Sequence, residues 1–444
     1  MLKENEIISR TLLTIDKFKG SVGTFKAAIT AGEYTSLNMP NCFTRSLIWK
    51  VCLITESINL TTINQKLRDS RVVYHQLMHN KDMKISWSGL DPESAYYQPS
   101  NSVSRKASSK HKGTGKGMKN TLDRVHILHD PLSEENGSKV DETHDDNELL
   151  VAIILDVDRL LPGEAFYQNF PNKKQLVEIL YIWAKCNPQV GYKQGLHEII
   201  GLIFMHLSSE SVIIPQTNTF SNDDLKILDL YDINYLSHDV FTIFNKFMIQ
   251  SGIITNFYES EQSLWNSIER FNMYLMKIDQ FIHYTLNTKL KLEAQLWIIR
   301  YLRLLLSREL GEDVETTMLL WDKLIASQLS SDHLGSNLTA IPELLIFIII
   351  QLLMQKKSEI IASDFSECLS LLLHYPVNFT SQEARNEFIR KLYKDATKMY
   401  ERRDNDLKLY EYGVKLNKEK MKFEKTRLEM RLKKKVQLML NTQK

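Results

Sequence analysis

The 444-residue sequence has few of the residues that build metal centres and disulfide frameworks. Its four cysteines, at positions 42, 52, 186 and 368, show neither the Cys-x-x-Cys spacing nor the Cys/His cluster of a zinc site. We therefore expect no metal site. We also expect the cysteines to be reduced, as they are in most cytosolic proteins.

Long hydrophobic runs are also missing. The first 20 residues mix charged and apolar side chains, so they lack the uninterrupted apolar stretch of a secretory signal. The longest apolar run, Leu344 to Met354, is broken only by Gln351 and is far shorter than the roughly 20 residues that span a bilayer. Because it follows Pro342, which favours a helix start, we predict a buried core helix there.

Proline and glycine are scarce, with ten and sixteen residues, and no alternation of apolar and polar residues lasts long enough to predict a sheet. The formal net charge of +2 does not indicate a nucleic-acid partner, and no aromatic and basic nucleic-acid module is present. Apolar residues recur instead at helical spacing, which predicts an all-α fold. The predicted helical segments are 43–53, 149–161, 174–185, 196–207, 239–248, 293–306 and 315–327.

Two segments depart from this pattern in composition. From Gln98 to about Asp146 the chain is rich in Ser, Lys, Gly, Asn and Asp, and it buries too little apolar surface to offset the entropy lost on ordering. We predict a disordered insertion, centred on about 98–129. Residues 386–444 are rich in Lys, Arg and Glu. An apolar stripe through Val414, Met421 and Leu428 predicts a basic amphipathic or coiled-coil tail there. A solvated extension, a partner-binding helix and a membrane-binding helix all fit this tail.

Two short patterns carry candidate chemistry. In Ile-Ile-Leu-Asp-Val-Asp-Arg, Asp156 and Arg159 lie three residues apart on a predicted helix, which in isolation is an ordinary ion pair. In Tyr192-Lys-Gln194-Gly195, a turn opens an apolar helix. The glycine allows close backbone approach, and the glutamine projects where amide groups are free to bind a ligand. Alone, the second pattern is typical of a capping turn.

Together these patterns resemble the TBC-domain Rab GTPase-activating proteins, whose signatures Ile-x-x-Asp-x-x-Arg and Tyr-x-Gln-Gly occur in this order. The resemblance covers roughly 42–78 and 130–327. Tyr301 and Leu310 stand where the family usually has Trp and Phe. The sequence near Asp130 is similar to a subgroup that includes retromer-associated and fungal Golgi-endosome members. Three further family motifs are matched by Arg45 and Trp49, by the segment 297–310 that contains Arg300, and by Trp321 and Asp322.

The resemblance implies a helical TBC domain over 41–327, interrupted by the insertion, with 1–40 as an N-terminal segment and 328–385 as its C-terminal helical part. It implies that the chain is not itself an enzyme but a GTPase activator, in which Arg159 is an arginine finger and Gln194 a glutamine finger. The remaining motif residues are implied to be positioning residues (Asp156, Tyr192 and Gly195) or mainly structural ones (Arg45, Trp49, Arg300, Trp321 and Asp322).

The implied partner is a Rab/Ypt GTPase in its GTP form. Because that partner binds the Mg-GTP, the resemblance implies no cofactor for this chain. It further implies a role in vesicle-mediated transport, in the cytoplasm and peripherally at Golgi or endosomal membranes, with the tail available to a trafficking coat or a membrane surface. Two alternatives remain: a catalytically silent TBC domain that acts as a Rab effector or scaffold, and a helical protein whose basic tail binds membrane or nucleic acid.

Overall fold

The computed structural model describes residues 2–33, 43–99, 142–215, 220–311, 314–327 and 341–422. Within these ranges the chain is built from helices, and its only extended pairing is an isolated bridge between Val212 and Asp232. The predicted all-α fold is therefore confirmed. Among the described helices, none has both the length and the apolar character needed to cross a membrane.

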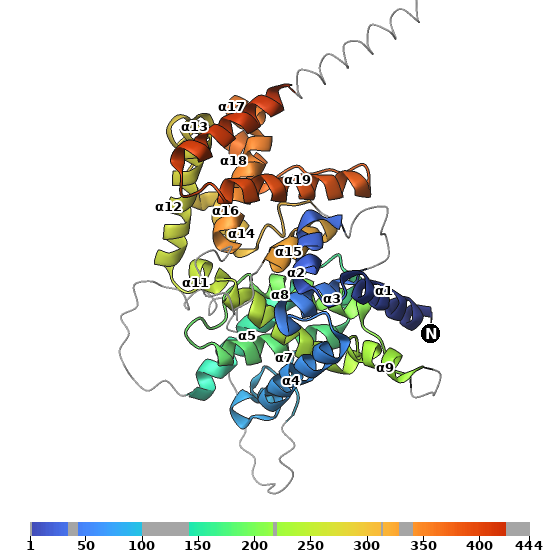
Figure 1. Cartoon of the computed structure of the whole chain (residues 1–444). Coiled ribbons are helices and arrows are strands. Elements are labelled where there is room, and N and C mark those ends of the chain that lie inside the picture. Colours follow the sequence, from blue (N-terminus) through green and yellow to red (C-terminus); the bar gives the residue numbers. More distant parts are fainter. Residues whose placement is uncertain are drawn as a thin grey trace, which may run out of the picture.

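The N-terminal half of the chain, blue to green in Figure 1, forms the lower part of the molecule in that view. Helices α5, α7 and α8 pack together, and α10 packs against α8 and α4. The helices of this half are α1 Leu2–Phe18, α2 Val22–Ala31, α3 Arg45–Trp49, α4 Leu60–His79, α5 Glu142–Asp158, α6 Ala165–Gln168, α7 Phe170–Cys186, α8 Leu196–Glu210, α9 Asn222–Asp229 and α10 Leu236–Asn245.

The C-terminal half forms the upper part of the molecule in Figure 1. Its helix α15 also packs against α2 and α3 and so joins the two halves. The helices of this half are α11 Ile253–Phe257, α12 Glu261–Ile278, α13 Gln280–Tyr284, α14 Gln295–Arg303, α15 Val314–Ser327, α16 Ile341–Gln355, α17 Lys357–Ala362, α18 Phe365–Leu373 and α19 Gln382–Tyr400.

Helix α16 lies at the centre of the C-terminal half. The apolar run from Leu344 to Met354 is buried along its whole length, and α12, α14 and α19 pack around it. The sequence therefore predicted this core helix correctly. A helix that is apolar on every side is stable in water only when neighbours cover all of its faces, as they do here.

Two predicted boundaries differ from the structure. Helix α5 begins at Glu142, so the end of the predicted 98–146 insertion is helical, while 100–141 lies outside the described residues. Helix α14 ends at Arg303 instead of continuing to 306. Leu305 and Leu306 have φ angles of 50° and 64°, in the left-handed region that a right-handed α-helix cannot contain.

The predicted tail is also different. Its boundary at residue 386 falls inside α19, whose Leu392 and Met399 are buried against the domain. The next helix, 406–422, packs through Leu409 and Leu416, whereas Met421 of the predicted stripe is 63% exposed. Residues 386–422 are therefore part of the folded body, and Leu428 and the rest of the stripe lie outside the described residues.

Candidate functional site

Arg159 directly follows α5, which ends at Asp158. Its side chain is 59% exposed and forms an ion pair with Asp156, whose side chain is only 10% exposed. The carboxylate is therefore fixed in the domain, while the guanidinium reaches outward from it. A planar guanidinium in this setting keeps donors free for a second, external acceptor.

Gln194 lies in the turn that precedes α8, and it is exposed. Among the described residues, none hydrogen-bonds to its side-chain amide. The next residue, Gly195, has φ 105°, and an added Cβ would lie 3.1 Å from Leu304 Cδ2 and 3.4 Å from Tyr258 Oη. The backbone conformation therefore favours glycine, the turn packs closely on these two side chains, and it presents the glutamine to solvent.

A hydrogen-bonded chain connects these two segments. The Tyr192 hydroxyl donates to Asp156 Oδ2 at 2.6 Å, and its oxygen lies 2.9 Å from His197 Nδ1. The backbone N–H of Gly195 also points to His197 Nδ1, at 3.4 Å, so His197 contacts the Gln194 turn as well as Tyr192. Arg159, Asp156, Tyr192 and His197 thus form one chain that fixes the two motifs relative to each other.

Burial shapes the protonation of this chain. It raises the pKa of the Tyr192 phenol, and the hydrogen bond to Asp156 raises it further, so the phenol remains a donor. Burial also lowers the pKa of His197, although the charges of Asp156 and Glu198 act in the opposite direction. The imidazole is therefore neutral near pH 7.

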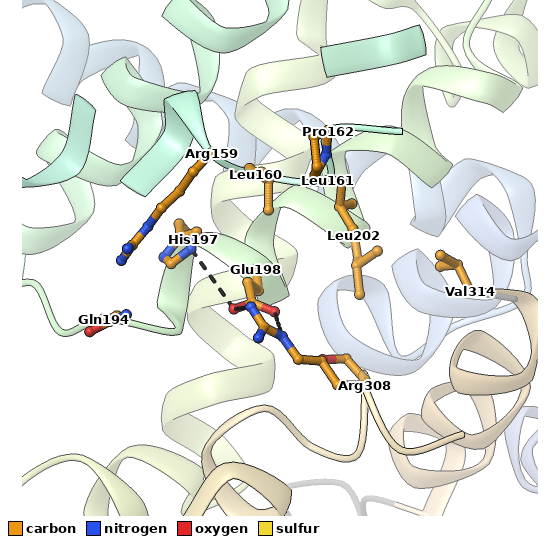
Figure 2. Close-up of a pocket in the computed structure, with 11 residues that line it drawn as sticks. Arg159, Leu160, Leu161, Pro162, Gln194, His197, Glu198, Leu202, Arg308 and Val314 are labelled. Atoms are coloured by element: carbon orange, nitrogen blue, oxygen red, sulfur yellow. Dashed lines mark hydrogen bonds and ion pairs between the residues drawn. The ribbon is translucent and has the colours of Figure 1, made fainter. Parts of the chain in front are cut away.

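Arg159 and Gln194 line one cavity of about 420 Å³. Figure 2 shows both of them on one side of an ion pair between Glu198 and Arg308. Arg308 Nη2 lies 2.6 Å from Glu198 Oε1, and Nε lies 2.8 Å from Oε2. On the other side of this pair the cavity is apolar, lined by Leu161, Leu202 and Val314.

The donor set of this site suits an anionic partner. Arg159 can bridge phosphate oxygens, and the amide of Gln194 can both donate and accept a hydrogen bond. Within the described ranges, no group of three or more His, Cys, Asp or Glu side chains has the arrangement of a metal site. The site therefore offers a cation and an amide to whatever enters the cavity.

A second polar cluster, which we call the Arg45 cluster, consists of Arg45, Trp49, Glu315 and Asp322. Arg45 Nε lies 3.1 Å from Asp322 Oδ1, and Trp49 Nε1 donates to the same oxygen at 2.7 Å. Arg45 also pairs with Glu315 at 2.8 Å. Burial would lower the pKa of Arg45, but the two carboxylates raise it well above its ordinary value. This cluster fastens α3 to α15 and does not line the cavity.

The last two predicted motif residues, Arg300 in α14 and Trp321 in α15, both contact the segment that connects these two helices. Arg300 pairs with the buried Glu309 at 2.6 Å, and the Trp321 indole donates to the Leu305 carbonyl at 3.0 Å. Neither residue lines the cavity. Sequence reasoning did not pair Glu198 with Arg308, because the two are 110 residues apart.

Comparison with known proteins identifies the family that the sequence motifs resemble. A family model described as the Rab-GTPase-TBC domain matches residues 118–361. The chain is 25% identical over 275 residues to human TBC1 domain family member 5, covering 56% of this chain and 33% of that protein. It is 24% identical over 227 residues to GTPase-activating protein gyp1 of Schizosaccharomyces pombe, covering 50% and 40%. The chain thus spans well under half the length of these relatives.

Among solved structures, the crystal structure of the Ypt/Rab-GAP domain of Gyp1p superposes with a TM-score of 0.52. The sequence identity is 17%, and the match covers 80% of this chain and 88% of the other. At this identity the likeness is one of fold, and it supports the helical architecture described above.

Proposed function

Because the chain belongs to the Rab-GTPase-TBC domain family, we propose that it is a GTPase-activating protein that accelerates GTP hydrolysis by a Rab/Ypt GTPase. A small GTPase hydrolyses GTP slowly, since charge on the transferring phosphoryl group is poorly stabilised and the attacking water is poorly oriented. The exposed Arg159 can stabilise the charge, and the exposed Gln194 can orient the water. In this account the chain contributes residues to the partner's active site and has no turnover reaction of its own.

Arg159 acts as the arginine finger. Its guanidinium enters the GTPase active site and bridges oxygens whose charge grows in the transition state. An arginine supplied in trans contributes roughly 10³ to 10⁵ in rate. Asp156 holds the inner side of the guanidinium, so little conformational entropy is lost when the finger enters the partner site.

Gln194 acts as the glutamine finger and orients the attacking water. Its amide oxygen accepts from the water while its amide nitrogen donates to a phosphate oxygen. Gly195 allows the tight turn, and Tyr192 links that turn to Asp156. The Mg-GTP belongs to the partner, so this chain requires no cofactor for its role.

One observation carries this proposal: Arg159 and Gln194 open into the same cavity and are joined through the Tyr192 to Asp156 hydrogen bond. This arrangement also favours an active GTPase activator over a silent effector, because an effector needs contact area and has no use for two exposed catalytic side chains on one cavity. For the cellular setting we propose the Golgi-endosome system and its Rab. The support for this setting is the subgroup resemblance in sequence.

A single-turnover hydrolysis assay tests the proposal. Each member of a panel of GTP-loaded Rab proteins is mixed with the full chain, and phosphate release is followed for the wild type, Arg159→Ala and Gln194→Ala. We expect the wild type to accelerate hydrolysis strongly for at least one Rab. Neither variant should do so. Binding of a Rab without acceleration would instead establish the effector alternative, and acceleration by both variants would exclude the finger assignments.

A further inference from the structure

We propose that the Gln194 turn is held in its catalytic position by the opposite half of the molecule, through Arg308, Tyr258 and Leu304. These residues then act as positioning residues for the glutamine and do not touch the GTPase. This inference rests on the proposed function, and it explains why the connection between α14 and α15 contributes to the site.

Tyr258 and Leu304 form the floor beneath the turn. A Cβ added at Gly195 would lie 3.1 Å from Leu304 Cδ2 and 3.4 Å from Tyr258 Oη, so the turn rests directly on both side chains. Tyr258 is itself fixed, because it is buried and its hydroxyl donates to the Arg303 carbonyl at 2.6 Å. The floor thus has little freedom to move relative to the end of α14.

Arg308 clamps the other side of the turn. Its partner Glu198 lies in the first turn of α8, directly after the Gln194 turn. Both guanidinium to carboxylate bonds are short, at 2.6 and 2.8 Å, and a bidentate pair fixes orientation as well as distance. The Glu198 side chain is 13% exposed and the Arg308 side chain is 56% exposed, so the carboxylate is fixed in the domain and Arg308 covers it from the solvent side.

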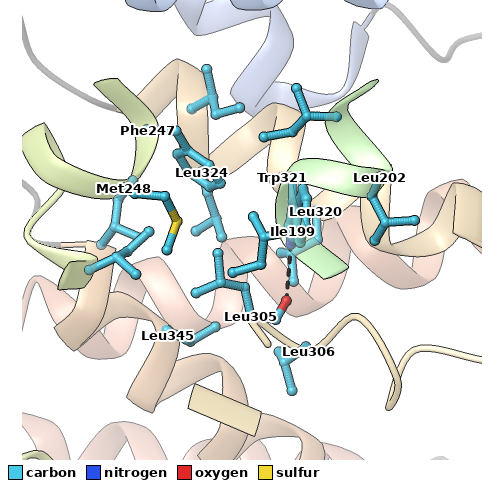
Figure 3. Close-up of a cluster of buried hydrophobic side chains, with 14 of the residues drawn as sticks. Ile199, Leu202, Phe247, Met248, Leu305, Leu306, Leu320, Trp321, Leu324 and Leu345 are labelled. Atoms are coloured by element: carbon cyan, nitrogen blue, oxygen red, sulfur yellow. Dashed lines mark hydrogen bonds between the residues drawn. The ribbon is translucent and has the colours of Figure 1, made fainter. Parts of the chain in front are cut away.

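The segment that carries Leu304 and Arg308 is rigid enough for this role. Leu305 and Leu306 adopt left-handed backbone conformations, which non-glycine residues keep only where the surroundings enforce them. Both side chains are fully buried, and Trp321 donates to the Leu305 carbonyl at 3.0 Å. Figure 3 shows this bond within the apolar cluster. The position of Gln194 therefore depends on packing in the C-terminal half.

The two fingers are thus fixed by different means. Asp156, near the end of α5, holds Arg159. The Gln194 turn is linked to Asp156 through Tyr192, and it has a second support from a segment more than a hundred residues further along the chain. Loosening the clamp should therefore displace Gln194 and leave Arg159 in place. Small displacements of catalytic groups are costly, because a shift of about 1 Å lowers a rate by up to about 100-fold.

The test uses Glu198→Gln, Arg308→Gln and the reciprocal swap Glu198→Arg with Arg308→Glu. A matched control is Glu387→Gln, which removes an exposed ion pair with Arg390 on α19.

Single-turnover hydrolysis is measured against concentration of the chain. We expect each single variant to lower the maximal rate by about tenfold with a half-saturating concentration within about twofold of wild type. The swap should restore most of the rate, and in a Gln194→Ala background neither single variant should lower it further.

Two results would overturn the proposal. An Arg308→Gln variant that binds the GTPase more weakly, beside a normal Glu198→Gln variant, would show that Arg308 contacts the partner. Normal maximal rates for both variants would show that the clamp does not position Gln194.

Hydrogen–deuterium exchange on the chain alone gives an independent readout. Amides of 192–198 should exchange faster in both single variants than in wild type and in Glu387→Gln, and unchanged exchange would overturn the proposal. If the two single variants exchange faster but the wild-type protein accelerates no Rab, the pairing of Arg308 with Glu198 does hold the turn and the proposed function is excluded.

Discussion

The site around Arg159 and the Arg45 cluster use the same residue types for opposite purposes. In each, an arginine pairs with an aspartate of a family motif. The Arg45 side chain is 13% exposed and pairs with Asp322 and Glu315, which are 277 and 270 residues away. The Arg159 side chain is 59% exposed, and its partner is three residues earlier in the chain, near the end of α5. A largely buried arginine with distant partners holds a fold together, whereas an exposed one with a local partner remains available to another molecule.

The aspartates differ in the same sense. Asp322 is completely buried and accepts from Arg45 and Trp49, so both of its neighbours depend on it. Asp156 accepts from Tyr192 with one oxygen and pairs with Arg159 through the other. Removing the first should therefore change stability, and removing groups at the second site should change catalysis.

The largest effect on stability is expected for Asp322→Ala. The substitution leaves the guanidinium of Arg45 and the indole of Trp49 without their shared acceptor in a buried place. Breaking a buried ion pair on one side costs about 3 to 5 kcal/mol. Urea denaturation measures this loss, and hydrolysis per folded molecule should stay near wild type. A loss below about 1 kcal/mol would mean that the Arg45 cluster does not hold α3 to α15.

The next largest effect, on stimulated hydrolysis rather than on stability, is expected for Gln194→Ala. Because the side chain is exposed and has no partner among the described residues, the melting temperature should not change. Stimulated hydrolysis should fall by about 10² to 10³, as it does when one preorganised hydrogen-bonding group is removed from a site. The decisive partner is a Rab whose own catalytic glutamine has been replaced. If that Rab is still fully stimulated by the variant, the water is oriented by another group.

The smallest effect concerns His197 and pH. Burial lowers its pKa, so the folded protein binds fewer protons than the unfolded chain near the ordinary histidine value of 6.5. Stability should therefore be level at higher pH and should fall as the pH drops below about 6.5. His197→Asn keeps a hydrogen-bonding group toward Tyr192 and removes this titration. The stability lost between pH 7.5 and 5.5 should be smaller in the variant by about 1 kcal/mol or less. An equal loss in both proteins would assign the pH dependence to other buried histidines.

Sequence patterns predicted the parts of this architecture that depend on local order. Helical periodicity identified α7, α8 and α15, because a helix that buries one face repeats its apolar residues at fixed spacing. The two short signatures selected Arg159 and Gln194, and the structure places both on one cavity. The predicted roles of these residues are proposals for the assays above.

Features that arise from tertiary contact could not be predicted in this way. Nothing near Arg308 in sequence indicates that its partner is Glu198, because folding alone brings them together. The left-handed Leu305 and Leu306 interrupt a segment that is apolar at helical spacing, and buried packing overrides that preference. In the predicted tail, composition left a solvated extension, a partner-binding helix and a membrane-binding helix open, and it did not indicate that Leu409 and Leu416 are buried against the domain.

The most direct test of the account is a paired measurement on Arg159→Lys and Arg45→Lys. Melting temperature and single-turnover hydrolysis are measured on the same samples with a responsive Rab. Lysine keeps the charge but loses the fork that bridges two acceptors. We predict that Arg159→Lys melts like wild type and stimulates hydrolysis about 10³-fold less, while Arg45→Lys melts lower and keeps its activity per folded molecule. A well-folded Arg159→Lys protein that stimulates the Rab at near wild-type rate would contradict the assignment of Arg159 as the arginine finger.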